Sequence, residues 1–268
     1  MIRLSVYTVT LNEEKRLSLM LEKASIVADE IVVVDSGSTD GTEAIAKEYG
    51  ARFISNKWES IGHQVSFAEN CCENEWVLLL AADEVLSDGL VDEILDLKKG
   101  PKYDGYKLRI GDVFPGIPQP KRWVKHYKLV RLYNRSKMKM SGRLGHDDVV
   151  FIGKNPRVTI LKNFVRHFSY LSVSRLMQKR NKATDEQVKR ALLEGKCYSP
   201  WRMVGAMTLN FLKCFFLYRY FLYGFWGFLI SISVGHMRFL KFAKFFEYRQ
   251  LEKFPYPGRS AEKKNTRD

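Results

Sequence analysis

Residues 31–40 read I-V-V-V-D-S-G-S-T-D, and this stretch decides the fold class. Its first four residues form a continuous β-branched run, which is typical of a strand buried on both faces of a parallel sheet. Asp35 ends the run, and small hydroxyl and glycine residues follow it. Because open α/β sheets bind ligands at the carboxyl ends of their strands, the position of Asp35 favours a binding site at that edge.

Asp35 has two interpretations at this point. With Ser36, Gly37 and Ser38 it provides polar groups that suit hydrogen bonds with a base or a ribose, while the chain turns into the next helix. Alternatively, the segment only caps that helix, whose start would be Thr39 or Asp40. The stretch alone leaves both interpretations open.

Strand and helix patterns alternate through the first hundred residues. Apolar runs predict strands at 2–10, 30–34, 51–55 and 76–80, and the last of these leads directly to Asp83 and Glu84. Helical patterns lie between and after them, at about 17–28, 39–49, 62–73 and 87–99. This order predicts a parallel sheet wound with helices. Shorter alternating runs from 103 to 165 are expected to extend the sheet and to build the far wall of the site.

The net charge of the chain is +14, which points to an anionic partner such as nucleic acid, an acidic lipid surface or a phosphorylated substrate. Four cysteines have neither a disulfide-framework nor a zinc spacing, so we expect reduced thiols. The chain enters a strand pattern at once, with no basic leader or cleavable apolar region. The catalytic part is therefore expected on the cytoplasmic side.

Basic residues are concentrated in the middle of the chain. No acidic residue lies between Val113 and His146, and nine basic residues fall there: Lys121, Arg122, Lys125, Lys128, Arg131, Arg135, Lys137, Lys139 and Arg143. The segment is either a solvated face or the docking surface for a phosphate-bearing acceptor.

Residues 201–248 are aromatic and apolar, with basic residues spaced through them. The run 220–237 carries no charge and is flanked by Arg219 and Arg238, but its length is borderline for crossing a bilayer. We expect a helical hairpin lying in the plane of a membrane or inserted shallowly, in preference to a true span. The alternative is a buried helix pair or a dimer interface in a soluble protein. Residues 255–268 are expected to be a polar disordered tail.

Together these residues resemble the family 2 glycosyltransferases of the GT-A fold, and most closely the lipopolysaccharide core glycosyltransferases. The resemblance rests on T-L-N-E-E at 10–14, A-D-E-I-V-V-V-D-S-G-S-T-D-G-T at 28–42, the A-D-E after W-V-L-L-L, G-H-D near 145, H-F-S-Y near 167 and the apolar carboxyl-terminal region. It implies an α/β fold with a mixed, mainly parallel wound sheet, helices on both faces and a C-terminal helical, membrane-associated region.

The resemblance also implies an organisation and an activity. Residues 1–100 would bind the nucleotide sugar, 101–170 would form the acceptor side, and 171–254 would be the membrane-associating region. The expected reaction is hexosyl-type transfer, with inversion, from a nucleotide diphosphate, UDP foremost, to a lipid-linked or lipopolysaccharide-type acceptor. Its expected location is the cytoplasmic face of the inner membrane, as a peripheral or monotopic protein, with homo-oligomers through the C-terminal helices as a further expectation. Nucleic acid is disfavoured because no binding motif for it is present.

The implied donor site comes from the first two strand ends. On resemblance, Asp35 reads the nucleobase, and the loop after the first strand lines the base and ribose pocket through Thr10, Leu11, Asn12 and Glu13.

The implied chemical site includes a divalent metal, Mg or Mn, which would bridge the phosphates through oxygen ligands. Asp83 would be the metal ligand, and His167 would complete the metal site or touch the diphosphate, unless it is a structural histidine. Asp147 is the expected general base, with Asp148 in reserve.

Two departures from the family pattern bear on this site. Ala81 stands where relatives usually carry the first acid of an Asp-x-Asp motif, and Val65 and Ser66 replace a basic residue and an asparagine. Three interpretations follow: a weakened but real transferase, a variant substituted to trap a ligand, or an inactive relative kept for assembly.

Overall fold

The computed structural model describes residues 1–143, 148–153, 156–170 and 172–253. The chain forms two compact units, Met1–Tyr170 and Leu171–Asp268, which we call the sheet unit and the helical unit. The expected tail at 255–268 lies outside the described residues.

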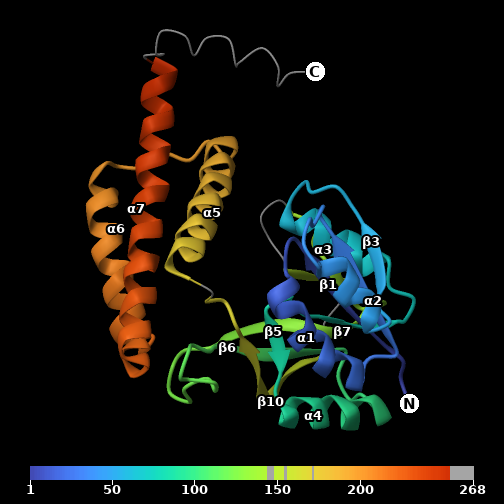
Figure 1. Ribbon diagram of the computed structural model, residues 1–268. Coiled ribbons are helices and arrows are strands. Elements are labelled where there is room, and N and C mark those ends of the chain that lie inside the picture. The colour runs from blue at the N-terminus through green and yellow to red at the C-terminus, as the bar shows by residue number, and fades with distance from the viewer. Residues whose placement is uncertain (144–147, 154–155, 171, 254–268) are drawn as a thin grey trace. The chain divides into compact units, whose positions relative to one another are not determined.

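The sheet unit is built on one eight-stranded sheet with the order β3-β2-β1-β4-β7-β6-β10-β5 (Figure 1). Only β7 and β5 run antiparallel to their neighbours, so the sheet is mixed but mainly parallel. A separate hairpin pairs β8 with β9. The strands are β1 (Leu4–Thr10), β2 (Glu30–Asp35), β3 (Arg52–Ser55), β4 (Trp76–Leu79), β5 (Glu84–Leu86), β6 (Gly105–Asp112), β7 (Tyr127–Asn134), β8 (Met138–Met140), β9 (Val149–Phe151) and β10 (Val158–His167).

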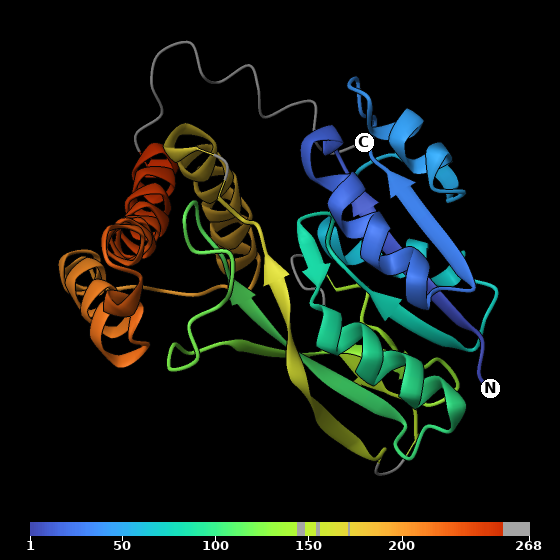
Figure 2. The same ribbon diagram turned by 60° about the horizontal axis from the view of Figure 1, so that its bottom comes forward.

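Helices cover both faces of this sheet, as the sequence predicts. On one face, α1 (Glu14–Val27) and α4 (Asp88–Lys99) pack their apolar stripes on β1, β2 and β4, and Figure 2 shows α4 in front of the strands. On the other face, α3 (Ile61–Asn70) and the β8–β9 hairpin enclose a second core. The predicted order is confirmed for β1 to β4 and α1 to α4, whereas β5, which pairs with β10, was not predicted. The strands β6, β7 and β10 extend the sheet beyond β4.

Helix α2 (Thr42–Glu48) begins later than the sequence pattern predicts. The Asp40 carboxylate accepts a hydrogen bond from the backbone N–H of Thr42 (3.1 Å), so it serves a backbone donor at the start of the helix. Residues 36–41 consequently form a loop at the carboxyl edge of the sheet, where a ligand-binding surface is expected.

The helical unit contains a long hairpin and one further helix. Its elements are α5 (Val173–Leu193), α6 (Trp201–Leu212), the π-helical turn η1 (Lys213–Leu217), the 3-10 turn η2 (Tyr220–Tyr223) and α7 (Phe225–Lys253). Both α5 and α6 pack against α7 (Figure 1). Two glycines of α7 allow close backbone packing: a Cβ at Gly227 would overlap the carbonyl of Tyr220, and one at Gly235 would lie 2.7 Å from the carbonyl oxygen of Met207.

Within the described part of the chain, no helix combines the length and the hydropathy required to cross a membrane.

Candidate active site

The loops that follow β1 and β2 are joined into one surface. The backbone N–H of Asn12 donates to Ser38 Oγ (2.7 Å), and Asn12 Oδ1 accepts from the backbone N–H of Thr39 (2.9 Å). Asn12 adopts a φ of 56°, in the left-handed region that asparagine tolerates better than most residues. Asn12 therefore connects the two loops, and the predicted donor residues Thr10, Asn12 and Ser38 lie together.

Asp35 is buried beneath this surface and holds the turn after β2. Its Oδ1 accepts from Thr10 Oγ1 (2.8 Å) and Ser38 Oγ (2.6 Å), and its Oδ2 accepts from the backbone N–H groups of Gly37 (2.8 Å) and Ser38 (2.6 Å). Burial opposes ionisation, but these hydrogen bonds outweigh it and hold the pKa of Asp35 below its usual value. Since a carboxylate has about four acceptor positions, a nucleobase would have to displace one of these donors to reach Asp35.

Gln64 is a residue of this edge that sequence reasoning missed. Its side chain is fully buried, its Nε2 donates to Ser36 Oγ (3.0 Å) and to the carbonyl of Asn56 (3.0 Å), and its Oε1 accepts from Asn56 Nδ2 (2.9 Å). Gln64 thus ties α3 to the turn that Asp35 organises. Its signal in the sequence is a glutamine on the apolar face of a helix.

The departures on α3 have different environments. Val65 is 2% exposed and packs in the core between α3 and the sheet, so an apolar side chain at this position has a packing explanation. Ser66 lies close to Gly142 instead, because a Cβ at Gly142 would be 3.6 Å from Ser66 Oγ.

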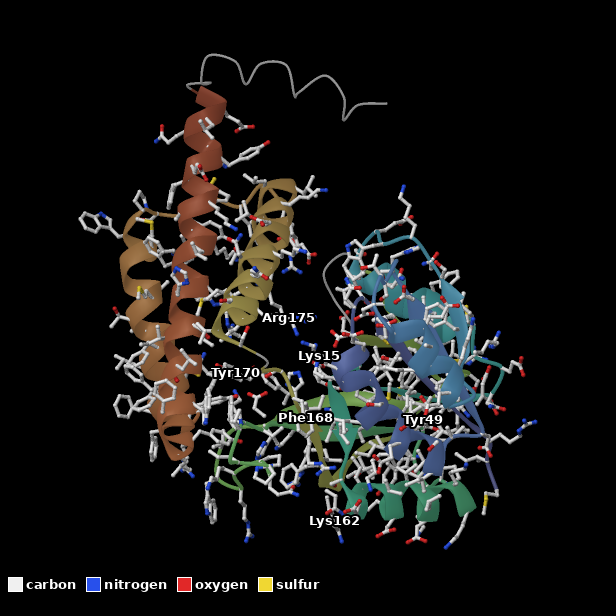
Figure 3. The ribbon with its side chains drawn as sticks, in the orientation of Figure 1. Lys15, Tyr49, Lys162, Phe168, Tyr170 and Arg175 are labelled. Carbon is white, nitrogen blue, oxygen red and sulfur yellow. The ribbon has the colours of Figure 1, made fainter. Side chains whose placement is uncertain are left out.

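A buried arginine joins the first loop to the end of β4. Arg16 donates through Nε and Nη2 to both carboxylate oxygens of Glu13 (2.6–2.9 Å), and through Nη1 to Asp83 Oδ2 (3.1 Å) and to the carbonyl of Phe168 (3.0 Å). Figure 3 labels Phe168, which follows β10 directly. No sequence pattern distinguishes Arg16, because it lies within the charged run E-E-K-R.

His167 extends the same cluster at the end of β10. Its Nδ1 lies 2.9 Å from Asp112 Oδ1, and its Nε2 lies 3.6 Å from Asp83 Oδ2. Burial by itself would lower the pKa of His167, but these two carboxylates outweigh burial and raise the pKa to about 10. The imidazole is therefore protonated at neutral pH, and Asp112 is a second site residue that sequence reasoning missed.

These contacts bear on the expected metal site. Among the described residues, no group of three or more His, Cys, Asp or Glu side chains is arranged to hold a metal ion. Asp83 Oδ2 is paired with Arg16, and His167 has a carboxylate near each ring nitrogen. Both groups are thus engaged with protein partners, and this donor set does not fit a metal centre in the arrangement observed.

The Ala81 position lies in the turn between β4 and β5. Its backbone N–H donates to Glu84 Oε2 (3.0 Å), and Glu84 is buried. Glu84 pairs in register with His167 across β5 and β10, so this carboxylate is at the same edge but is used to stabilise the turn.

The two candidate bases, Asp147 and Asp148, are neighbours in the chain. Asp147 lies outside the described residues. Asp148 is exposed and precedes β9, and its Oδ1 accepts from Ser141 Oγ (2.6 Å). Asp148 therefore joins the two sides of the β8–β9 hairpin.

The basic segment leaves the site edge directly. Val113 follows Asp112, and its backbone N–H donates to the carbonyl of His167 (3.1 Å). The connection from β6 to β7 then exposes Trp123 (65%), with the guanidinium of Arg122 5.3 Å from its ring centroid, while Lys121 and Lys125 are exposed beside it. An aromatic side chain among cations thus lies in the connection that begins directly after Asp112.

Comparison with known proteins identifies the family of this chain. The family model described as Glycosyl transferase family 2 matches residues 5–155. An uncharacterized glycosyltransferase of Rickettsia typhi is 36% identical over 254 residues, which cover 90% of this chain and 86% of the relative. The lipopolysaccharide core biosynthesis glycosyltransferase LpsC of Rhizobium meliloti is 27% identical over 261 residues, covering 94% and 95% of the two chains.

Among solved structures, Staphylococcus aureus TarS 1–349 in complex with UDP-GlcNAc is similar with a TM-score of 0.46 and 15% identity, over 93% of this chain and 92% of that one. The sheet is mixed and mainly parallel and carries helices on both faces, as the family resemblance implies. The chain belongs to glycosyltransferase family 2.

Proposed function

We propose that this protein transfers a sugar from a nucleotide diphosphate, UDP foremost, to a hydroxyl group of a lipid-linked or lipopolysaccharide-core acceptor, with inversion at the anomeric carbon. The observation that carries the proposal is the joined β1 and β2 loop surface at the carboxyl edge of a family 2 sheet. The acceptor class is supported by the name of LpsC, which aligns with nearly the whole chain.

On the donor side, Asp35 acts by shaping the turn that faces the nucleotide. It fixes the backbone of Gly37 and Ser38, which together with Asn12 presents polar groups for a ribose or base. Leu11 is 46% exposed between these groups and offers an apolar surface to the flat face of a base. Glu13 lies further in, paired with Arg16, and contributes by holding the loop.

In the chemical step, a carboxylate takes the proton of the acceptor hydroxyl as its oxygen attacks the anomeric carbon. A bond from this oxygen to the carbon forms while the bond to the diphosphate breaks on the opposite face, so the proton ends on the base and the nucleoside diphosphate leaves. Asp147 is the proposed base and Asp148 its reserve. The Mg or Mn ion that the resemblance implies enters no step, because Asp83 and His167 are engaged with other partners.

On the acceptor side, charge and aromatic surface support a phosphate-bearing amphiphile. The β6–β7 connection supplies Trp123 with flanking cations. In the helical unit, residues 195–246 contain seven basic and no acidic residues. Large apolar side chains are exposed around the end of the α6–α7 hairpin: Phe216, Leu217, Phe221, Leu222 and Phe225. These features suit an anionic membrane surface, with the protein peripheral or monotopic on the cytoplasmic face of the inner membrane, although the same apolar surface would also suit a homo-oligomer.

Calorimetry of the full chain against a panel of UDP- and GDP-sugars tests the proposal. We expect one nucleotide sugar to bind, Asp35→Ala to abolish binding, and Asp147→Asn to preserve binding while removing transfer. Asp104 provides a matched control, because it bonds to the backbone N–H of Arg157 next to the start of β6, at the other end of that strand from Asp112. A folded chain that binds none of the panel would contradict the proposal and would favour a non-catalytic scaffold.

A further inference from the structure

Asp83 stands where the family pattern leads one to expect a metal ligand, but its contacts assign it another role. Its Oδ2 is 3.1 Å from Arg16 Nη1 and 3.6 Å from His167 Nε2, and its backbone carbonyl accepts from the N–H of Phe168 (2.8 Å). The carboxylate is therefore placed between the Arg16 guanidinium and the His167 imidazole, at the point where α1, the β4–β5 turn and the end of β10 meet.

Arg16 is fully engaged in this arrangement. Its five N–H groups find acceptors in Glu13, Asp83 and the carbonyl of Phe168, and the residue is 7% exposed. If Asp83 turned to ligate a metal, Arg16 would lose a carboxylate partner in a site with little water to replace it. The guanidinium therefore resists the movement that a metal would require.

The charges around Asp83 also oppose the binding of a metal ion. The Arg16 guanidinium lies between Glu13 and Asp83 and is paired with both carboxylates. A divalent cation at Asp83 would approach this guanidinium at short range, and like charges in a site of low dielectric repel strongly. With Ala81 supplying no second carboxylate, little on the protein side offsets that repulsion.

We propose that Asp83 is a positioning residue that holds Arg16 and His167 at the carboxyl edge of the sheet, and that this chain binds its nucleotide diphosphate without a divalent metal. The second half of this inference rests on the proposed function, since it presumes a nucleotide ligand. The assignment of Asp83 as a positioning residue does not depend on the proposed function, because it follows from the contacts of Asp83 alone.

The first test titrates Mn²⁺ alone into the full chain and into Asp83→Asn, and follows free Mn²⁺ by electron paramagnetic resonance. We expect both proteins to bind Mn²⁺ equally, within about threefold, because Asp83 is committed to Arg16. A wild-type affinity at least about tenfold higher than that of Asp83→Asn would overturn the assignment.

The second test needs no variant and remains decisive if Asp83→Asn fails to fold. Binding of UDP to the wild-type chain is measured by calorimetry in EDTA and in Mn²⁺, and we expect dissociation constants that agree within about threefold. Binding weakened about tenfold or more by EDTA would overturn the inference. If no UDP binds in either condition, the metal-free half falls together with the proposed UDP donor, while the Mn²⁺ comparison still decides the role of Asp83.

A thermal readout separates positioning from ligation. As a positioning residue, Asp83 stabilises the fold, so Asp83→Asn should lower Tm equally in EDTA and in Mn²⁺. Asp96→Asn is the matched control, because Asp96 forms an exposed ion pair with Lys99 and its loss should leave Tm nearly unchanged. A Tm loss for Asp83→Asn that appears only in Mn²⁺ would identify a metal ligand and contradict the proposal.

Discussion

The sheet unit buries polar side chains, whereas the helical unit exposes apolar ones. In the sheet unit, Asp35 and Asp83 are buried, and each is matched by donors or cations from segments distant in sequence. In the helical unit, Phe216, Leu217 and Phe225 are 59–70% exposed, although the chain has buried apolar cores elsewhere. Clustered exposure of this kind marks an interaction surface, whereas buried paired carboxylates mark a site that is held rigid.

The two units are therefore expected to be sensitive to different kinds of substitution. The sheet unit should respond most to loss of a buried partner, since an uncompensated charge then remains inside. The helical unit should respond most to crowding at its close helix contacts and, for membrane binding, to polarity at its exposed hairpin end.

The largest expected effect is the loss of Arg16. Arg16→Met leaves Glu13 and Asp83 buried without their cation, and breaking such a pair costs about 3–5 kcal/mol of the free energy of unfolding. Urea denaturation of the full chain measures it. Lys47→Met is the control, because Lys47 pairs with Glu43 at an exposed position and its loss should cost about 1 kcal/mol or less. Similar losses in both variants would refute the distinction between buried and surface pairs.

The next effect is a pH dependence in the sheet unit. The pKa of His167 is raised to about 10 by Asp112 and Asp83, so its contribution to stability is complete below its unfolded pKa of about 6.5 and is lost as pH rises through about 10. The difference in unfolding free energy between wild type and His167→Gln should therefore shrink by roughly 2–4 kcal/mol between these limits. A difference independent of pH would mean that His167 is neutral.

A smaller effect is expected from crowding in the helical unit. Gly227→Ala places a methyl group against the carbonyl of Tyr220, so the hairpin must separate at a cost of about 1–3 kcal/mol. Gly205 in α6 has open space around its Cβ position, and Gly205→Ala should instead stabilise by about 0.5–1 kcal/mol through helix propensity. Chemical denaturation followed by circular dichroism checks both variants. Equal stability of the two would show that α7 does not pack closely on the η2 turn.

The smallest effect concerns membrane affinity. Replacing Phe216 and Leu217 by serine should weaken binding to vesicles containing anionic lipid about tenfold, or about 1.4 kcal/mol, while leaving stability unchanged because both side chains are exposed. Leu193→Ser is the control, since Leu193 is 72% exposed at the end of α5. Sedimentation with vesicles measures the affinity. If the double variant binds vesicles as wild type does but changes its oligomeric state, the hairpin end is a protein interface.

Much of the fold was predictable because its signals are local. The β-branched run ending at Asp35 specifies a buried parallel strand, and the alternation of such runs with helical stripes specifies the wound sheet. The turn after Asp35 could equally be predicted from local sequence, since three of the four hydrogen bonds that Asp35 accepts come from Gly37 and Ser38. The helical hairpin was predicted from composition, but the close contact at Gly227 was not.

The candidate site was predictable only in part. Asp35 and Asp83 follow apolar runs that the pattern predicts as strands, whereas His167 was selected on the family resemblance. Arg16, Gln64 and Asp112 carry no such signal. Arg16 lies in a charged run, the signal of Gln64 is only its position on the apolar face of a helix, and Asp112 ends a strand in a segment assigned to the acceptor side.

The sequence by itself determined the order of strands and helices, the edge at which the site lies and the family to which the chain belongs, because each depends on periodicity or on contiguous residues. Only the tertiary structure decided what Asp83 and His167 contact. Their partners lie far away along the chain, as Arg16 is 67 residues from Asp83 and Asp112 is 55 residues from His167. Ion pairs over such separations are set by strand register and helix packing, which no local pattern encodes.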